Sequence, residues 1–273
     1  MNKQKHITIV GSDNHPILVD MSFPENSKDT KVVVFAHGFK GFKDWGPFHK
    51  ISQYFAGEGF VFVKFNFSHN GTTADDPINF GDLEAFGNNN FCKELDDLGF
   101  VLYWIEKNLN PTEISLFGHS RGGGISMLKT AEYNRIRKVI SWASPSNFSN
   151  RLIEERIASW KEKGVAFVYN GRTKQNMPMY FQFYENCIKN NERINIKSAI
   201  EKLTIPQLIV HGNDDPTVKL AEAKNLKKWN SSAQLSIIDG SDHVFGGFHP
   251  FDLEEFPPHL KEAIDITINF LKQ

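Results

Sequence analysis

The stretch Glu113-Ile-Ser-Leu-Phe-Gly-His-Ser-Arg-Gly-Gly-Gly124 joins a short apolar run to a segment of helical composition. The apolar run, 114–117, ends in the pentapeptide Gly118-His119-Ser120-Arg121-Gly122. A strand that turns sharply into a helix around one serine is the setting of the Gly-x-Ser-x-Gly nucleophile elbow. Its serine has a strained backbone, and glycine is needed on both sides because side chains would not fit. The pentapeptide therefore predicts Ser120 as a nucleophile if the chain also supplies a base, an acid and an oxyanion site.

The composition is typical of a globular protein that buries a large core. The chain has 273 residues, of which 40% are hydrophobic and 23% charged, and its net charge is −1. Nucleic acid is not an expected partner, because the chain has no surplus of basic residues. No run approaches the ~18 apolar residues of a membrane span, so we expect no membrane partner and a cytoplasmic location. The distant cysteines, Cys92 and Cys187, favour reduced, buried thiols over a disulfide.

Short apolar runs alternate with helical segments along most of the chain. The expected strands are 32–36, 60–67, 114–117, 138–143, 206–210 and 235–238, preceded by a hairpin over 7–21. The expected helices are 48–55, 91–107, 125–132, 221–229 and 253–271. This alternation predicts an α/β fold with a mainly parallel, doubly wound sheet. We expect the whole chain, 1–273, to form a single domain.

The alternation of strands and helices is interrupted between Pro145 and Thr204. An amphipathic helix over 151–163, a hairpin over 165–178 and a ring-rich helix over 180–189 are expected in this part. Because the sheet pattern resumes afterwards, the sequence predicts a cap inserted into the domain over about residues 149–203. The aromatic residues of the cap fit two roles, lining an acyl or aromatic pocket and packing the cap onto the body.

Residues that can carry chemistry follow several of the expected strands. In parallel α/β sheets ligands bind at the carboxyl ends of the strands. Those ends carry His37-Gly38-Phe39, then Ser120, then Asp214-Asp215, then Asp242-His243. The chain therefore presents a serine, an acid and a histidine in that order, which is the order of the α/β-hydrolases. With no cysteine cluster and no His-x-x-x-His helix beside them, neither a metal nor a cofactor is expected.

Together these segments resemble the α/β-hydrolases over nearly the whole chain. The resemblance rests on the elbow, on His37-Gly38, on residues 211–218 (His-Gly-Asn-Asp-Asp-Pro-Thr-Val) and on residues 240–243 (Gly-Ser-Asp-His). The chain is most similar to small bacterial esterases related to the cinnamoyl and feruloyl esterases and to dipeptidyl-peptidase-like hydrolases. The resemblance implies an α/β-hydrolase fold. It also implies a carboxylesterase-like serine hydrolase that cleaves a small-molecule ester through an acyl-enzyme without a cofactor.

Each residue of the predicted triad has a chemical role. Ser120 is the nucleophile, and His243 is the base that removes its proton during attack. The imidazolium that forms needs an oriented carboxylate on its other nitrogen. The family pattern assigns this role to Asp215, which stands directly before Pro-x-Val, and Asp214 is its competitor.

The negative oxygen of the tetrahedral intermediate needs hydrogen-bond donors, which the resemblance implies are the backbone N–H groups of Phe39 and Arg121. His37 is expected to support the loop that carries Phe39, and His119 to pack beside the nucleophile. The guanidinium of Arg121 has two possible partners, a substrate carboxylate and a local carboxylate, of which the local one is favoured.

Two other functions remain open from the sequence. An amide or peptide hydrolase would use the same triad, and a catalytically silent binding module could keep the same fold. Such silent modules typically lose the serine, the histidine or the oxyanion loop, whereas this chain retains all three. Ser120 argues against a haloalkane dehalogenase, because that class of enzyme requires aspartate at this position.

Overall fold

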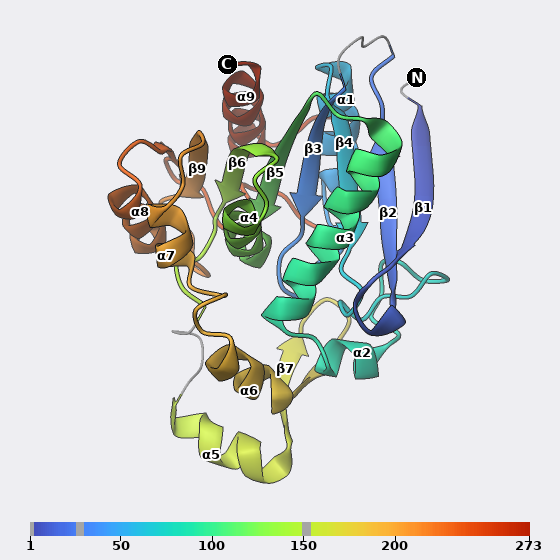
Figure 1. Cartoon of the computed structure of the whole chain (residues 1–273), viewed down its shortest axis with the longest axis vertical. Helices are drawn as coiled ribbons and strands as arrows, with labels where there is room; N and C mark the ends of the chain where they lie inside the picture. Colours follow the sequence, from blue (N-terminus) through green and yellow to red (C-terminus); the bar gives the residue numbers. More distant parts are fainter. Residues whose placement is uncertain (1–2, 26–29, 149–153) are drawn as a thin grey trace.

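The computed structural model describes residues 3–25, 30–148 and 154–273. These residues form an eight-stranded sheet of order β1-β2-β4-β3-β5-β6-β9-β10, together with a small two-stranded sheet (Figure 1). The large sheet contains β1 (Gln4–Val10), β2 (Pro16–Ser22), β3 (Lys31–Ala36), β4 (Val61–Asn66), β5 (Glu113–His119), β6 (Ile136–Trp142), β9 (Gln207–Gly212) and β10 (Gln234–Ile238). Strands β1 and β2 form an antiparallel hairpin, β2 pairs antiparallel with β4, and the other pairings are parallel. The predicted α/β class and mainly parallel sheet are confirmed.

Helices cover both faces of the sheet, as the apolar strands predicted. In β3, Val32 and Val34 belong to one buried cluster, while Val33 and Phe35 belong to another. The first cluster includes residues of α3 (Phe91–Leu109), α4 (Arg121–Glu132) and α8 (Leu220–Trp229). The second includes residues of α1 (Phe48–Gly57) and α9 (Pro258–Lys272). A strand buried on both sides needs apolar residues at successive positions, which is why β3 reads as a continuous apolar run.

The predicted cap range, 149–203, contains several elements. Its described part has α5 (Glu154–Lys163), a hairpin of β7 (Val165–Asn170) and β8 (Gln175–Tyr180), α6 (Gln182–Lys189) and α7 (Ile196–Glu201). Helices α5 and α6 and strand β7 lie beyond the carboxyl ends of the large sheet's strands (Figure 1). By contrast, α7 packs against α4 and α8. The start of the range, 149–153, lies outside the described residues, and the cap as a unit stays a prediction.

Several helices differ from the sequence predictions: α4 begins at Arg121 rather than at residue 125, and α7 lies where no helix was predicted. The closing helix was expected over 253–271, but α9 begins at Pro258. Pro257 is extended, with ψ of 148°, because a residue that precedes proline is driven out of the helical region. Pro258 then occupies the first turn, where its missing N–H costs no hydrogen bond. The short helix α2 (Leu83–Gly87) was not predicted; Asp82 caps it by accepting a hydrogen bond from the N–H of Ala85.

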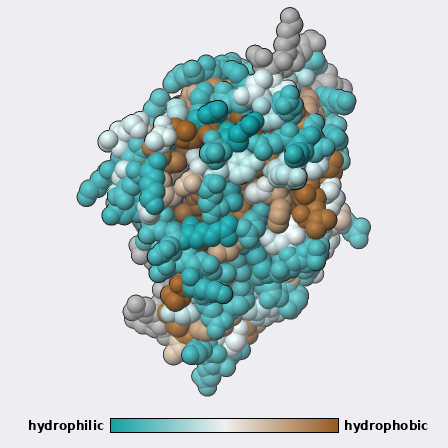
Figure 2. Space-filling model, in the orientation of Figure 1, coloured by the Kyte–Doolittle hydropathy of each residue, from teal (hydrophilic) through white to brown (hydrophobic). Residues whose placement is uncertain are grey.

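The molecular surface is mostly polar on the face drawn in Figure 2, where hydrophobic residues gather in small patches among hydrophilic ones. No helix of the described ranges is long and apolar enough to cross a membrane.

The first turn of α4 presses directly against the sheet, and two glycines make this contact possible. A Cβ on Gly122 would lie 2.1 Å from the carbonyl oxygen of Ala36, and a Cβ on Gly118 would lie 2.2 Å from the carbonyl oxygen of Gly122. Both contacts are with backbone atoms, which cannot rotate away.

We therefore expect Gly122→Ala to lower the free energy of unfolding by about 2 kcal/mol or more, because the added methyl group forces the helix away from β3. Denaturant unfolding followed by circular dichroism measures the change. Gly57→Ala is the matched control, since a Cβ there has no atom within 4 Å. Equal stability of the two variants would contradict the close approach.

Candidate active site

The predicted nucleophile stands at the turn between β5 and α4 with a strained backbone. Ser120 has φ of 54° and ψ of −124°, a conformation that side-chain-bearing residues rarely adopt. Its N–H donates to the carbonyl of Trp142 on β6 at 2.8 Å, and its own carbonyl accepts from Gly123 at 2.9 Å. Strain of this kind persists only where surrounding bonds hold it, and here β6 and α4 supply those bonds.

An acid and a histidine meet after the last two strands of the sheet. The Nδ1 atom of His243, which follows β10, lies 2.7 Å from Oδ2 of Asp215, which follows β9. The other oxygen of Asp215 accepts the N–H groups of Thr217 and Val218 at 2.7 and 2.8 Å. Asp214 is exposed, whereas Asp215 is buried. The carboxylate that contacts His243 is therefore that of Asp215.

The surroundings of Asp215 favour its ionised form. Burial by itself raises the pKa of this carboxyl, but the hydrogen bonds from His243 and from the N–H of Val218 outweigh it, and the pKa falls below its ordinary value. His243 therefore faces an anion that can hold an imidazolium in place.

Ser120, His243 and Phe39 line one cavity of about 210 Å³. The loop that carries Phe39 lies directly beside the serine, since a Cβ on Gly38 would be 3.1 Å from Cβ of Ser120. The structure thus brings the predicted nucleophile, base and oxyanion loop to the same place, with Asp215 behind the base.

His37 fastens the loop that carries Phe39. Its Nδ1–H donates to the carbonyl of Gly38 at 2.9 Å, and its Nε2 accepts the N–H of Phe67 at 3.3 Å. Burial outweighs the bond to Gly38 and lowers the pKa of His37 to about 4. The ring is therefore neutral and both nitrogens are occupied, which agrees with the predicted supporting role.

His119 holds the loop of the candidate base. Its Nε2–H donates to the backbone carbonyl of His243 at 2.9 Å, and the two ring centroids are 4.9 Å apart. Burial, with His243 nearby, lowers the pKa of His119 to about 3. The sequence predicted that His119 packs near the nucleophile, but it did not reveal this bond to the loop of His243.

Arg121 pairs with a local carboxylate, as favoured from the sequence. Its NH1 donates to Oε1 of Glu94 on α3 at 3.1 Å, and its guanidinium lies 4.1 Å from the ring centroid of Phe39. Sequence reasoning did not identify Glu94. The available signal was its helical spacing with the buried Leu98 and Val101, which places a carboxylate in an apolar stripe.

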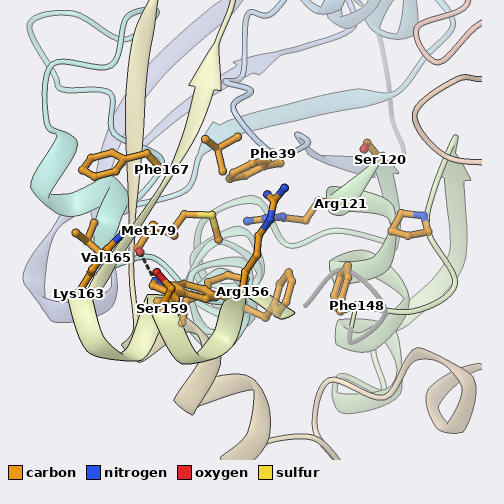
Figure 3. A pocket seen from close by; sticks show the side chains of 16 residues that line it. Phe39, Ser120, Arg121, Phe148, Arg156, Ser159, Lys163, Val165, Phe167 and Met179 are labelled. Atoms are coloured by element: carbon orange, nitrogen blue, oxygen red, sulfur yellow. Dashed lines mark hydrogen bonds between the residues drawn. The ribbon is translucent and has the colours of Figure 1, made fainter. Parts of the chain in front are cut away.

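A second, larger cavity of about 690 Å³ also reaches Ser120 (Figure 3). Three aromatic residues of the predicted cap range line it, Trp160, Phe167 and Phe183. Trp160 also packs against the core, and Phe183 is part of it. The cap aromatics therefore both line a cavity and pack against the body, and an acyl or aromatic ligand in that cavity stays a prediction. Among the described residues, no three His, Cys, Asp or Glu side chains gather as a metal site would require.

Comparison with known proteins supports the same architecture. No family model matches the chain. Lysophosphatidylserine lipase ABHD12 of Danio rerio is 21% identical over 212 residues, which are 77% of this chain and 49% of that protein, so the chain spans about half the length of this curated relative. Est1E from Butyrivibrio proteoclasticus, solved with ferulic acid, superposes with a TM-score of 0.73, 18% identity and coverage of 97% and 98% of the two chains. The chain has the α/β-hydrolase fold.

A putative hydrolase from Agrobacterium vitis has the same α/β-hydrolase fold, with a TM-score of 0.75, 16% identity and 99% of each chain covered. The predicted resemblance to the α/β-hydrolases is thereby confirmed at the level of the fold.

Three buried histidines make the stability of this α/β-hydrolase fold depend on pH. Burial is the main cause that lowers the pKa of these histidines from the ordinary value of 6.5. The pKa falls to about 4 for His37 and His69 and to about 3 for His119. Below pH 6.5 the unfolded chain binds protons that the folded chain cannot, so stability falls as the pH drops toward 4. For His37 the loss reaches about 3 kcal/mol.

Between about pH 6 and pH 4.5, we expect the unfolding free energy of His119→Gln to fall less steeply than that of the wild type, by about 1.4 kcal/mol per pH unit. The reason is that the variant binds one proton fewer when it unfolds. Denaturant unfolding over this range measures the slope. The wild-type protein, measured over the same pH range, gives the reference slope. An unchanged slope for His119→Gln would show that His119 does titrate in the folded protein.

Proposed function

We propose that the protein is a serine hydrolase that cleaves a small-molecule carboxylic ester through an acyl-enzyme intermediate. The observation that carries this proposal is the 2.7 Å bond between Asp215 and His243 at the cavity that also contains the strained Ser120. A serine, a histidine and a carboxylate in this arrangement are the parts of a nucleophilic triad.

The reaction follows from the roles of these three residues. Oγ of Ser120 attacks the ester carbonyl while Nε2 of His243 takes its proton, and Asp215 stabilises the imidazolium through Nδ1–H. His243 then gives the proton to the departing alcohol, which leaves the acyl group on Ser120. Water, deprotonated by His243, attacks the acyl-enzyme and releases the acid.

Backbone donors stabilise the tetrahedral intermediate in this proposal. They are the N–H of Phe39, in the loop braced by His37, and the N–H of Arg121 at the start of α4. Each donor of an oxyanion hole contributes about 3 kcal/mol to the transition state. The start of a helix is favourable for a developing negative charge because its N–H groups and dipole point that way.

The predicted cap, 149–203, sets the substrate range in this proposal. Residues of α5, β7 and β8 line the larger cavity beside Ser120. A change of side chain there alters the space for substrate without touching the triad. The ester-cleaving chemistry and the choice of ester are therefore separate properties of the chain.

Ser120→Ala should abolish labelling by a fluorophosphonate probe and lower ester turnover by about 10⁴-fold or more, because no other group takes the covalent intermediate. Intact mass spectrometry reads the label, and p-nitrophenyl acyl esters read the turnover. Ser231→Ala, at an exposed position, is the control and remains labelled. An unlabelled wild-type protein would favour the catalytically silent module, and faster turnover of aminoacyl p-nitroanilides would favour the amide hydrolase.

The neighbouring aspartates give a matched test of the acid. Asp215→Asn should lower kcat by about 10³- to 10⁴-fold, because the neutral amide neither fixes the reactive tautomer of His243 nor stabilises its charge. Asp214→Asn, which alters an exposed side chain one residue away, should stay within about 3-fold of wild type. Equal losses in the two variants would overturn the assignment of Asp215.

A further inference from the structure

Two cavities meet at Ser120, and they differ in what they can hold. His243 lines the cavity of about 210 Å³, whereas the described lining of the 690 Å³ cavity does not include it. The imidazolium of His243 must donate its proton to the oxygen of the departing alcohol. The alcohol therefore occupies the smaller cavity, and the acyl group that stays on Ser120 occupies the larger one.

The larger cavity has an apolar wall with basic groups in it. Its lining is mostly apolar and includes Phe39, Phe91, Trp160, Phe167, Met179 and Phe183. Its charged members are Arg121, Arg156 and Lys163, and no acidic residue is among the described residues that line it. Even with Glu94 ionised beside Arg121, three positive charges stand against one negative charge. An apolar cavity with this balance favours an apolar ligand that carries an anion.

Arg121 is held so that part of its guanidinium stays available to a ligand. The group lies 4.1 Å from the ring centroid of Phe39 and 5.0 Å from that of Phe91, and 14% of the side chain is exposed. Within the described part of the chain, its side-chain hydrogen bond is the one from NH1 to Glu94. The N–H groups of Nε and NH2 therefore remain for another acceptor. Figure 3 shows the side chains of Arg121 and Arg156 extending into the cavity.

Glu94 fixes Arg121 without fully cancelling its charge. Its Oε1 accepts from both Arg121 and Asn89, while its buried Oε2 has no hydrogen-bond partner within the described residues. Burial raises the pKa of this carboxyl despite the opposing effect of Arg121. A carboxylate in such a place is a weak competitor for the remaining guanidinium donors.

We propose that the enzyme acts on half-esters, in which a bulky apolar acyl group ends in a free carboxylate and the alcohol is small, with Arg121 as the specificity-determining residue. This inference rests on the proposed ester hydrolysis. A carboxylate matches the planar donor edge of a guanidinium in a paired geometry. Hydrolysis consumes one water, breaks the ester bond and yields a dicarboxylic acid and an alcohol.

Matched substrate pairs test the proposal. Monoethyl esters of linear dicarboxylic acids with about 6 to 12 carbon atoms, a span that the larger cavity accommodates, are compared with ethyl esters in which a methyl group replaces the free carboxylate. We expect kcat/KM to favour the half-ester by about 10- to 100-fold at the best chain length, the contribution of a charged hydrogen-bonded pair. Replacing ethyl by octyl in the same half-ester should lower kcat/KM by at least about 10-fold, because the smaller cavity limits the alcohol.

Variants assign the preference to a residue. Arg121→Gln keeps the backbone N–H, and we expect it to reduce the half-ester preference to about 3-fold or less, with part of the preference restored in Arg121→Lys. Arg156→Gln alters a partly solvent-exposed side chain that also lines the cavity, and it should reduce the preference by about 3-fold. This variant keeps the test decisive even if Arg121→Gln fails to fold. Arg137→Gln, exposed on β6 and outside both cavities, is the control and keeps the wild-type preference.

The outcomes separate this inference from the proposed function. Turnover of the neutral ethyl esters that depends on Ser120, without a preference for half-esters, would overturn the inference and leave the hydrolase intact. A preference that survives unchanged in Arg121→Gln and Arg156→Gln would overturn the assignment to the basic groups. Failure to hydrolyse every ester, together with absent fluorophosphonate labelling, would overturn both.

Discussion

The left-handed backbone of Ser120 is the constraint on which the rest of the site depends. A φ of 54° costs conformational energy, and the serine keeps it because β6 accepts its N–H and α4 begins at once behind it. That tight turn is possible only because Gly118 and Gly122 have no side chains where the helix and the sheet touch. The same turn puts Ser120 at the junction of two cavities. In the proposed reaction, the geometry of this one residue therefore determines both where attack occurs and where the two halves of the substrate lie.

Buried histidines hold the loops around this turn. His37 and His119 are neutral, and each of them ties a loop of the site through a backbone carbonyl. His243 differs because its Nδ1 faces the carboxylate of Asp215 while its ring lines a cavity. Three imidazoles line the smaller cavity: His37 and His119 are neutral supports, and His243 exchanges a proton in the proposed mechanism. Because the rings of His37 and His119 are held neutral, they also make the folded protein less stable in acid.

Much of the candidate site could be predicted from the sequence, but some of its contacts could not. Ser120, Asp215 and His243 were predicted as a group because polar residues at the ends of parallel strands must meet at one edge of the sheet. Pairing of Arg121 with a local carboxylate was also predicted, but Glu94 was not named. That residue lies 27 positions earlier on α3, and only the packing of α3 against α4 joins the two. Long-range contacts of this kind leave no local pattern in a single sequence.

The sequence by itself determined the succession of strands and helices and the residues that stand at the strand ends, because side-chain periodicity and glycine placement act over a few neighbouring positions. Only the tertiary structure decided which of two adjacent aspartates contacts His243, since that depends on how the turn after β9 meets the loop after β10. It also decided the sizes of the two cavities and the gathering of Arg121, Arg156 and Lys163 around the larger one. Those features arise from elements far apart in the chain, and packing brings them together.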